Sequence, residues 1–173
     1  MTKTRIVLVA AGLLLSLGGS AVARSSHSGG SLSTLDKEYL KNTAQSNLEE
    51  IQAGPRLAPR AATPQARAFA RRMVRDHTRA NAALKRVAAR TGDTLPTDIT
   101  SEQKAVINRL SQMHGSRFDA AYKQEMIRDH TGDIAKTRRE ISLGRNSLVR
   151  ASAQKNLRLL QMHLKMARVL PGR

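Results

Sequence analysis

Three of the five histidines in this 173-residue chain have a type and spacing that could bind a transition metal. His77 and His130 hold equivalent places in a repeated segment, MVRDHT at residues 73–78 and MIRDHT at residues 126–131. His163 lies in a leucine-rich stretch near the C-terminus. Neutral imidazole is a good ligand for zinc, copper and iron. A site for a single ion of this kind is therefore the first chemistry that these residues suggest.

The residues before the two repeated histidines place both on the inner face of a helix. An aromatic residue and a methionine precede each histidine by eight and four positions, namely Phe69 and Met73 in the first copy and Tyr122 and Met126 in the second. Positions i, i+4 and i+8 lie along one side of a helix. The thioethers therefore come within one turn of the imidazoles, a combination that would favour Cu(I).

A fourth candidate ligand is Glu50, at the edge of an earlier apolar helix face. With His77, His130 and His163 it could complete a mononuclear site for zinc, copper or iron. The alternative is that methionines at helical spacing fill the core and that the histidines are hydrogen-bonded core residues. No short His-x-x-x-His motif decides between these interpretations.

Other chemistries lack their signatures. A di-iron carboxylate site needs Glu three residues before each histidine, whereas the chain has Val74, Ile127 and Leu160 there. There is no cysteine, no Gly-x-Ser-x-Gly nucleophile motif and no phosphate-binding glycine loop. Nothing in the sequence argues for an enzyme.

Each repeated histidine follows an aspartate, Asp76 or Asp129. Neighbouring helical residues are offset by about 100°, so these carboxylates cannot easily share the inner face. Arg72 and Arg79 flank Asp76 at ion-pair spacing, which makes a surface pair the simplest interpretation. A role in holding a metal-binding histidine stays open, because the aspartate recurs in both copies.

The elements that must position these residues are four long amphipathic helices and one short helix. Their apolar periodicity predicts helices over residues 34–54, 64–90, 101–113, 116–143 and 147–169. Thr34 is the expected cap of the first helix, Thr63 with Pro64 of the second, and Thr100 with Gln103 of the short one. No stretch alternates like a strand. The pattern predicts an all-α, antiparallel four-helix bundle with one short connecting helix.

Turn residues set the expected boundaries. Gly54-Pro55 should end the first helix, and the prolines at 55, 59 and 64 predict a loop or broken extension after it. Gly92 should end the second helix and Gly115 the short one, with His114 at that end. In the core we expect a set of residues buried together: Phe69, Met73, Tyr122, Met126, Leu160 and Leu164.

The N-terminus predicts export. Lys3 and Arg5 precede an apolar run and a small-x-small site ending at Ala23, which together are typical of a secretory signal peptide over residues 1–23. A disordered leader should follow over residues 24–33, where His27 has no assigned role, and then a single helical domain over residues 34–170. We therefore expect a periplasmic or secreted protein.

The mature part is strongly basic. The whole chain has a formal charge of +17, and removal of Lys3 and Arg5 leaves 28 basic against 13 acidic residues, or +15. Export and the scarcity of aromatic residues argue against nucleic acid as the partner. Anionic envelope polymers or lipid headgroups are the expected partners, unless the charge is only a solvated basic surface.

Four segments form a recognisable set: residues 47–51, residues 69–77, residues 118–122 before His130, and His163-Leu164. Together they resemble the exported bacterial family catalogued as domain of unknown function 4142. The resemblance implies a ferritin-like four-helix fold in the periplasm or envelope, with no established activity. Its recurring positions fall on Glu50, Met73, His77, Phe118, Asp119, Tyr122, His130 and His163. Departures are Pro55-Arg56 inside a helix and Arg158 where proline is usual.

Two functions follow from these observations. The first is a periplasmic ferritin-like bundle that binds one metal ion through inward histidines, in metal handling or envelope stress. The second is a non-catalytic basic envelope protein with structural histidines, whose surface contacts anionic polymers or lipid headgroups.

Overall fold

The structure is a computed structural model that describes residues 31–172. The predicted signal peptide, His27 and most of the predicted leader lie outside this range. The chain forms helices α1 (Thr34–Leu57), α2 (Pro64–Thr91), α3 (Ser101–Ser111), α4 (Gly115–Leu143) and α5 (Ser147–Arg168), with a 3-10 turn η1 (Ala58–Arg60). Residues 31–172 contain no strand, only an isolated bridge between Ala61 and Gly115. The all-α prediction is confirmed.

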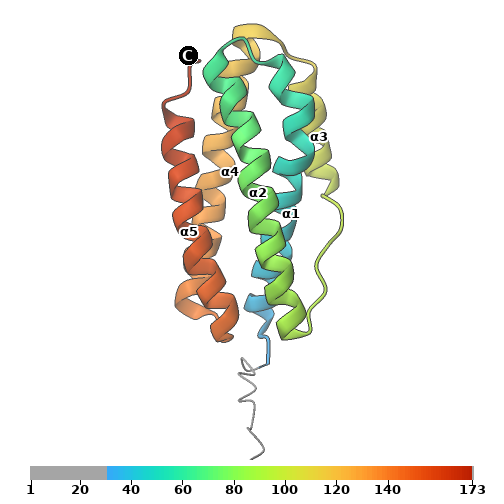
Figure 1. The fold of residues 1–173 in the computed structure, drawn as a ribbon, viewed down its shortest axis with the longest axis vertical. Helices are drawn as coiled ribbons and strands as arrows, with labels where there is room; N and C mark the ends of the chain where they lie inside the picture. Colours follow the sequence, from blue (N-terminus) through green and yellow to red (C-terminus); the bar gives the residue numbers. More distant parts are fainter. Residues whose placement is uncertain (1–30, 173) are drawn as a thin grey trace, which may run out of the picture.

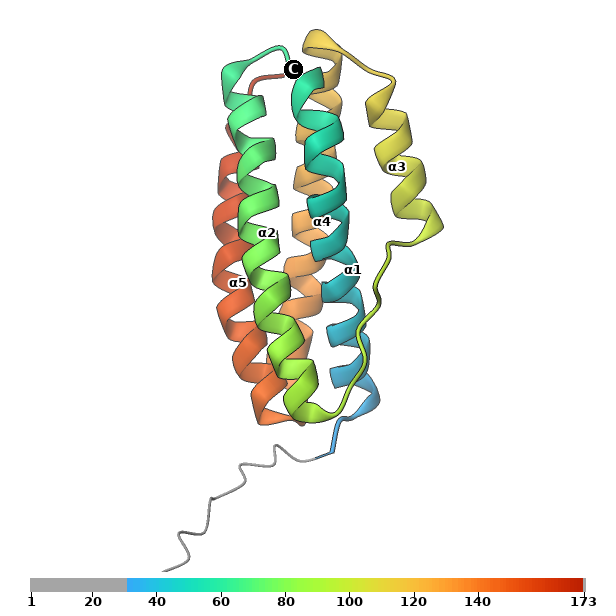
Figure 2. The same ribbon diagram turned by 45° about the vertical axis from the view of Figure 1, so that its right-hand side comes forward.

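The four long helices lie side by side along the long axis of the molecule, and α3 lies outside them against α1 (Figures 1 and 2). In chain direction, α1 and α5 run one way and α2 and α4 the other (Figure 1). Close contacts join α1 to α2, α2 to α5, α5 to α4 and α4 to α1. Each long helix therefore packs against two antiparallel neighbours. No helix in residues 31–172 has the length and hydrophobicity that a membrane span requires.

Two of the predicted helix starts are confirmed. Thr63 caps α2 by accepting a hydrogen bond from the Ala66 amide, and Pro64 follows at the first helical position. Thr100 and Gln103 form the predicted reciprocal capping box at α3. The end of α2 also agrees, since Gly92 adopts a left-handed conformation with φ 71°.

The start of α1 differs from the prediction. Ser33, not Thr34, is the cap: its hydroxyl accepts from the Asp36 amide, and the Asp36 carboxylate accepts from the Ser33 amide. This capping box pairs the backbone amides of Ser33 and Asp36, which the helix itself leaves without acceptors. Leu32 packs against the core. Leu32 and Ser33, predicted to belong to the disordered leader, are therefore part of the fold.

The end of α1 also differs, because the helix continues through Pro55 to Leu57. A proline in a helix interior costs roughly 3 kcal/mol, but Ala53, Gly54 and Leu57 all bury their inner side here. Gly54 serves packing rather than termination: a Cβ atom there would lie 2.0 Å from a Val74 methyl group of α2. Packing against α2 thus outweighs the local signal for a helix end. The loop or broken extension predicted after Gly54 is shorter than expected and consists of η1 and three further residues.

The junction of α3 and α4 is a third correction. α3 ends at Ser111 rather than Met113, and Gly115 is the first residue of α4 rather than a terminator of α3. Gly115 has φ 63°, a conformation that glycine adopts without strain. His114 consequently caps the start of α4 and makes no side-chain cap bond.

Two buried carboxylates tie the helix ends together. Asp119 of α4 accepts hydrogen bonds from the Ala62 and Thr63 amides ahead of α2. Asp36 of α1 accepts from the Arg145 and Asn146 amides in the turn between α4 and α5. These bonds fix the relative height of the helices, and height decides which side chains can meet.

The core has two apolar clusters. One contains Phe69, Met73, Phe118, Tyr122 and Met126, and the other contains Tyr39, Leu40, Leu84 and Val149. Tyr122 stacks on Phe118 with ring centroids 5.3 Å apart and meets Phe69 edge-on at 6.1 Å. Along α2 and α4, the repeated histidines follow the residues of the first cluster. They therefore lie in a polar layer between the two apolar ends.

Two members of the predicted core behave differently. Leu160 is buried, but it belongs to neither apolar cluster. Leu164 is only partly buried, so its prediction as a core residue is wrong. His163, one position earlier, takes the innermost place on α5, and an offset of about 100° turns Leu164 toward the side of the helix.

Candidate metal centre

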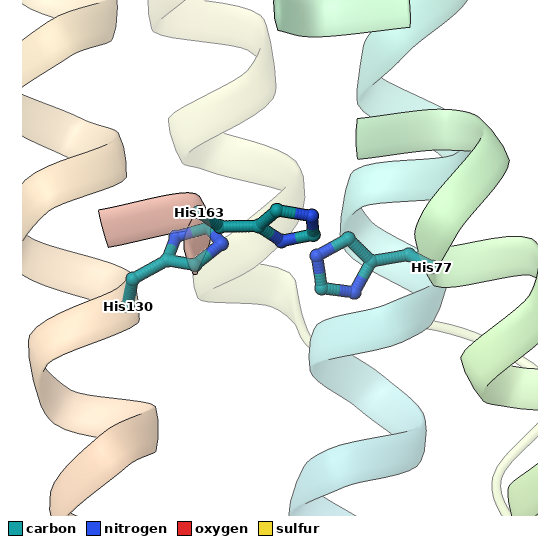
Figure 3. Close-up of side chains that lie close together, drawn as sticks. All are labelled: His77, His130 and His163. Atoms are coloured by element: carbon teal, nitrogen blue, oxygen red, sulfur yellow. The ribbon is translucent and has the colours of Figure 1, made fainter. Parts of the chain in front are cut away.

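The structure brings the three predicted histidines together at one level of the bundle (Figure 3). His77 comes from α2, His130 from α4 and His163 from α5. Their ring centroids are 5.9 Å apart for His77 and His130, 5.2 Å for His77 and His163, and 5.4 Å for His130 and His163. One ring nitrogen from each residue can be chosen so that all three lie within 4.8 Å of one another.

Each ring is held through one nitrogen by a protein oxygen. His77 Nδ1 lies 2.8 Å from Asn47 Oδ1, His130 Nδ1 lies 2.9 Å from the Met126 carbonyl oxygen, and His163 Nε2 lies 3.0 Å from Asp76 Oδ2. Each of these oxygens is an acceptor, so the ring nitrogen facing it carries the proton and donates. The tautomer of every ring is thereby set, and the opposite nitrogen keeps its lone pair.

Those opposite nitrogens have no partner. Among residues 31–172, no hydrogen bond reaches His77 Nε2, His130 Nε2 or His163 Nδ1, and all three atoms are buried. In Figure 3, a nitrogen of His77 and one of His130 point toward the ring of His163. An unsatisfied buried polar atom costs about 1–3 kcal/mol. A cation bound between the three rings would give all three unpaired nitrogens a partner.

The surroundings keep all three imidazoles neutral. Burial lowers the pKa of His77 well below its usual value, with further lowering from His130 and His163. Burial likewise lowers the pKa of His130 to about 4. At His163 burial lowers the pKa although the Asp76 carboxylate acts in the opposite direction. Metals bind the neutral form, so no proton has to leave before an ion enters at neutral pH.

The other candidate ligands are Glu50, Met73 and Met126, and all three are buried. Glu50 is buried in α1, but its carboxylate is outside the group of ligand atoms that lie within 4.8 Å. Burial raises its pKa well above the usual value. Met73 and Met126 are buried in the first apolar cluster. Of the two, Met126 touches the site through its backbone carbonyl, which accepts from His130.

Two residues that hold the triad were not predicted as site residues. Asn47 of α1 is buried and holds His77 across the interface with α2. Asn47 lies in the segment 47–51 that carries the family resemblance, but the sequence assigned it no role.

Asp76 is the second. Its carboxylate accepts from His163 of α5 and, 3.0 Å away, from Arg72 Nε of its own helix. The predicted surface pair with Arg72 is thus present, but the open alternative of a role beside a histidine also holds. Burial opposes ionisation of Asp76, and the bonds from His163 and Arg72 outweigh it and lower its pKa.

The triad itself has almost no contact with solvent. The exposed fractions are 1 % for His77, 2 % for His130 and 0 % for His163. Asp76, with a side chain 15 % exposed, is the contact of the triad that reaches nearest to the surface. The arrangement can hold an ion, but it leaves no open face on which a substrate could approach that ion.

Comparison with other proteins identifies a solved structure with a similar fold and the family of this chain. A solved structure described as a DUF305 fragment from Deinococcus radiodurans is similar, with a TM-score of 0.69 and 14 % sequence identity over 80 % of this chain and 95 % of that chain. At that identity the likeness concerns the fold alone. No curated protein matches the chain. Residues 21–170 match the family described as a domain of unknown function (DUF4142), and the protein therefore belongs to that family.

Proposed function

We propose that this protein binds one transition-metal ion through His77, His130 and His163. One observation carries the proposal: each imidazole is fixed through one nitrogen and presents the other, buried and unpartnered, to the same small space. A purely structural role would not require three ring nitrogens within 4.8 Å of one another to lack a hydrogen-bond partner. The same arrangement of an outer oxygen acceptor behind each ring is typical of metal-binding histidines.

The distances fit an ion of ordinary size. Ligands about 2.0–2.1 Å from one tetrahedral ion lie about 3.4 Å from each other. Ring nitrogens already within 4.8 Å of one another reach that spacing with shifts of under about 1 Å each. Small rotations of the side chains supply such shifts. Three neutral imidazoles suit zinc, copper or iron, and the absence of carboxylate ligands in the group disfavours magnesium and calcium.

The burial of the triad favours metal handling over catalysis. A catalytic ion needs an open coordination position that a substrate can reach, whereas all three rings here are at most 2 % exposed. We assign the protein a role in binding and holding metal, within a ferritin-like four-helix bundle. The side-by-side, antiparallel arrangement of α1, α2, α4 and α5 supports that description of the fold.

Export to the periplasm is part of the proposal and rests on the N-terminal sequence. The +15 mature protein would then meet metal ions outside the reducing cytoplasm. Mass spectrometry of protein recovered from the periplasmic fraction checks this. A chain that begins just after Ala23 is the expected result, and an intact N-terminus held in the membrane would contradict it.

Metal titration tests the binding itself. Protein purified without a histidine tag is stripped with chelator and titrated with Zn²⁺, Cu⁺, Cu²⁺ and Fe²⁺ by calorimetry and elemental analysis. We expect one ion per chain for at least one metal, together with a rise in melting temperature that grows with metal concentration.

The matched control is a histidine outside the triad. His163→Ala should abolish stoichiometric binding, whereas His114→Ala, at an exposed histidine at the start of α4, should leave it unchanged. Equal binding by the parent and His163→Ala would overturn the proposal and leave the histidines a structural role.

A further inference from the structure

Within residues 31–172, the net charge lies almost entirely on one side of the molecule. α2 carries eight arginines and lysines and one acidic residue, and α5 carries five and none. α1 and α4 together carry nine basic and nine acidic residues. α2 and α5 pack against each other and lie side by side in Figure 1. We call the arginines and lysines of α2 and α5 the basic face.

Most charges of the basic face are exposed and form no ion pair with a carboxylate. Arg71, Arg75 and Arg79 follow one another every four residues on the outer side of α2, and all three are exposed. Within residues 31–172, Arg72 is the only member of the basic face that forms an ion pair with a carboxylate. On the other side, Glu125 pairs with Arg109 and Arg128, and Asp133 pairs with Lys136. On the side formed by α1 and α4, acidic residues therefore balance the basic ones.

The chemistry of the basic face favours a polymer with phosphate groups. Arginine outnumbers lysine in both helices, and its planar guanidinium binds phosphate through two parallel hydrogen bonds. Rows of charge on helices of 28 and 22 residues extend for roughly 30–40 Å at 1.5 Å per residue. An elongated polyanion can follow such rows, and each contact releases bound counterions.

A membrane surface fits less well, because the basic face lacks apolar anchors. Peripheral membrane helices bury large apolar residues beside their basic ones. The large apolar side chains that are exposed in residues 31–172 are Leu143 at the end of α4 and Val169 just after α5. Neither lies within α2 or α5.

We propose that the basic face is a docking surface for a linear, phosphate-rich polyanion. This site is separate from the histidine triad, which is buried, and it does not depend on metal. It also goes beyond a general affinity of a basic protein for anions, because it assigns binding to one side of the molecule.

Two variants with the same charge change test the assignment. The triple variant Arg71→Gln, Arg75→Gln, Arg79→Gln removes three exposed charges from α2. The control Lys37→Gln, Lys41→Gln, Arg139→Gln removes three exposed charges from α1 and α4. Binding to long-chain inorganic polyphosphate is measured by fluorescence anisotropy at several salt concentrations, and circular dichroism checks that both variants remain helical.

We expect the α2 variant to lose at least tenfold in affinity and to reduce the slope of log K against log salt by about two to three. The control should lose less than about threefold. Equal losses in both variants would show that only total charge matters and would overturn the proposal.

The other anions separate the possible partners. Equal binding to poly-glutamate would remove the preference for phosphate, and binding to vesicles of anionic phospholipid without binding to polyphosphate would replace the polymer by a membrane. His163→Ala should bind polyphosphate like the parent. A failure of the metal proposal therefore leaves this one standing, and the reverse also holds.

Discussion

The two copies of the repeated segment, residues 73–78 in α2 and residues 126–131 in α4, have nearly the same sequence and different surroundings. Both histidines enter the core, and both threonines donate to the carbonyl four residues earlier, Thr78 to Val74 and Thr131 to Ile127. Each copy therefore builds the same local structure. The difference begins where the side chains reach neighbouring helices.

The aspartates show that difference most clearly. Asp76 faces α5 and accepts a hydrogen bond from His163, whereas Asp129 meets Arg128 on its own helix. Burial raises the pKa of Asp129 to about 6, and the nearby Glu49 carboxylate adds to the effect. The pKa of Asp76 is lowered because His163 and Arg72 donate to it. One residue type at one place in a motif thus has opposite electrostatics in its two copies.

The histidines are also held differently. His77 depends on a side chain of another helix, Asn47 of α1, while His130 donates to the Met126 carbonyl within α4. The repeat therefore determines which face a residue occupies. The neighbouring helix determines the chemistry of that residue.

The largest expected effect concerns what the copies share. His77→Ala and His130→Ala should each abolish stoichiometric metal binding, with losses of at least a hundredfold, because either change leaves two ligands. Calorimetric titration with the metal that the parent binds measures this. If one variant kept full affinity, the two copies would not contribute equally to the site.

Substitution of the two aspartates tests the main difference between the copies, which is that only Asp76 accepts a hydrogen bond from His163. Asp76→Asn should weaken metal binding by about 10- to 100-fold, the usual effect of losing the carboxylate behind a ligating histidine. Asp129→Asn is the matched control at the equivalent position and should stay within about threefold of the parent. Similar losses in both variants would mean that long-range charge, rather than the bond to His163, supports the site.

Much of this site could be predicted from the sequence, because it depends on helical periodicity. The spacing of Phe69, Met73 and His77 fixed an inner face, and a face is a local property. The height at which His163 meets the other two rings is not local. It depends on contacts such as those of Asp119 and Asp36 with distant backbone amides.

The sequence left two roles open for Asp76 and assigned none to Asn47, for the same physical reason. Neither lies at the centre of an apolar stripe, and each acts on a histidine of a different helix, Asp76 on His163 and Asn47 on His77. The Gly54-Pro55 pair was misleading in the opposite direction. It has the composition of a helix stop, but Gly54 is required where α1 approaches Val74 of α2.

His77 and His130 are held by different acceptors, and removal of the acceptor of His77 should affect metal affinity less than the Asp76 change. Asn47→Ala should reduce metal affinity by about tenfold, since His77 loses the acceptor that fixes its tautomer and orientation. No side-chain change can remove the corresponding anchor of His130, which is a backbone carbonyl. Titration of Asn47→Ala beside Asp76→Asn would rank the two anchors. An unchanged affinity would show that packing alone orients His77.

The smallest expected effect is on the stability of the metal-free protein, where the two aspartates should act with opposite signs. A carboxyl whose folded pKa is about 6, above the unfolded value of about 3.9, makes the fold less stable as pH rises between those values. Asp129→Asn removes this cost and should stabilise the protein by about 1 kcal/mol at pH 7. The gain should disappear near pH 4, where both states are protonated.

Asp76 should behave in the reverse way, because its folded pKa is lowered. Its ionised form contributes stability above about pH 4 and loses that contribution as pH falls through the folded pKa. Asp76→Asn should therefore cost about 1–2 kcal/mol at pH 7, with the difference shrinking below pH 4. Urea unfolding of both variants in chelator at pH 3, pH 4 and pH 7 measures the two effects together. If both variants lost the same amount of stability, the two aspartates would contribute equally to the free energy of unfolding. Their different partners would then have no energetic consequence.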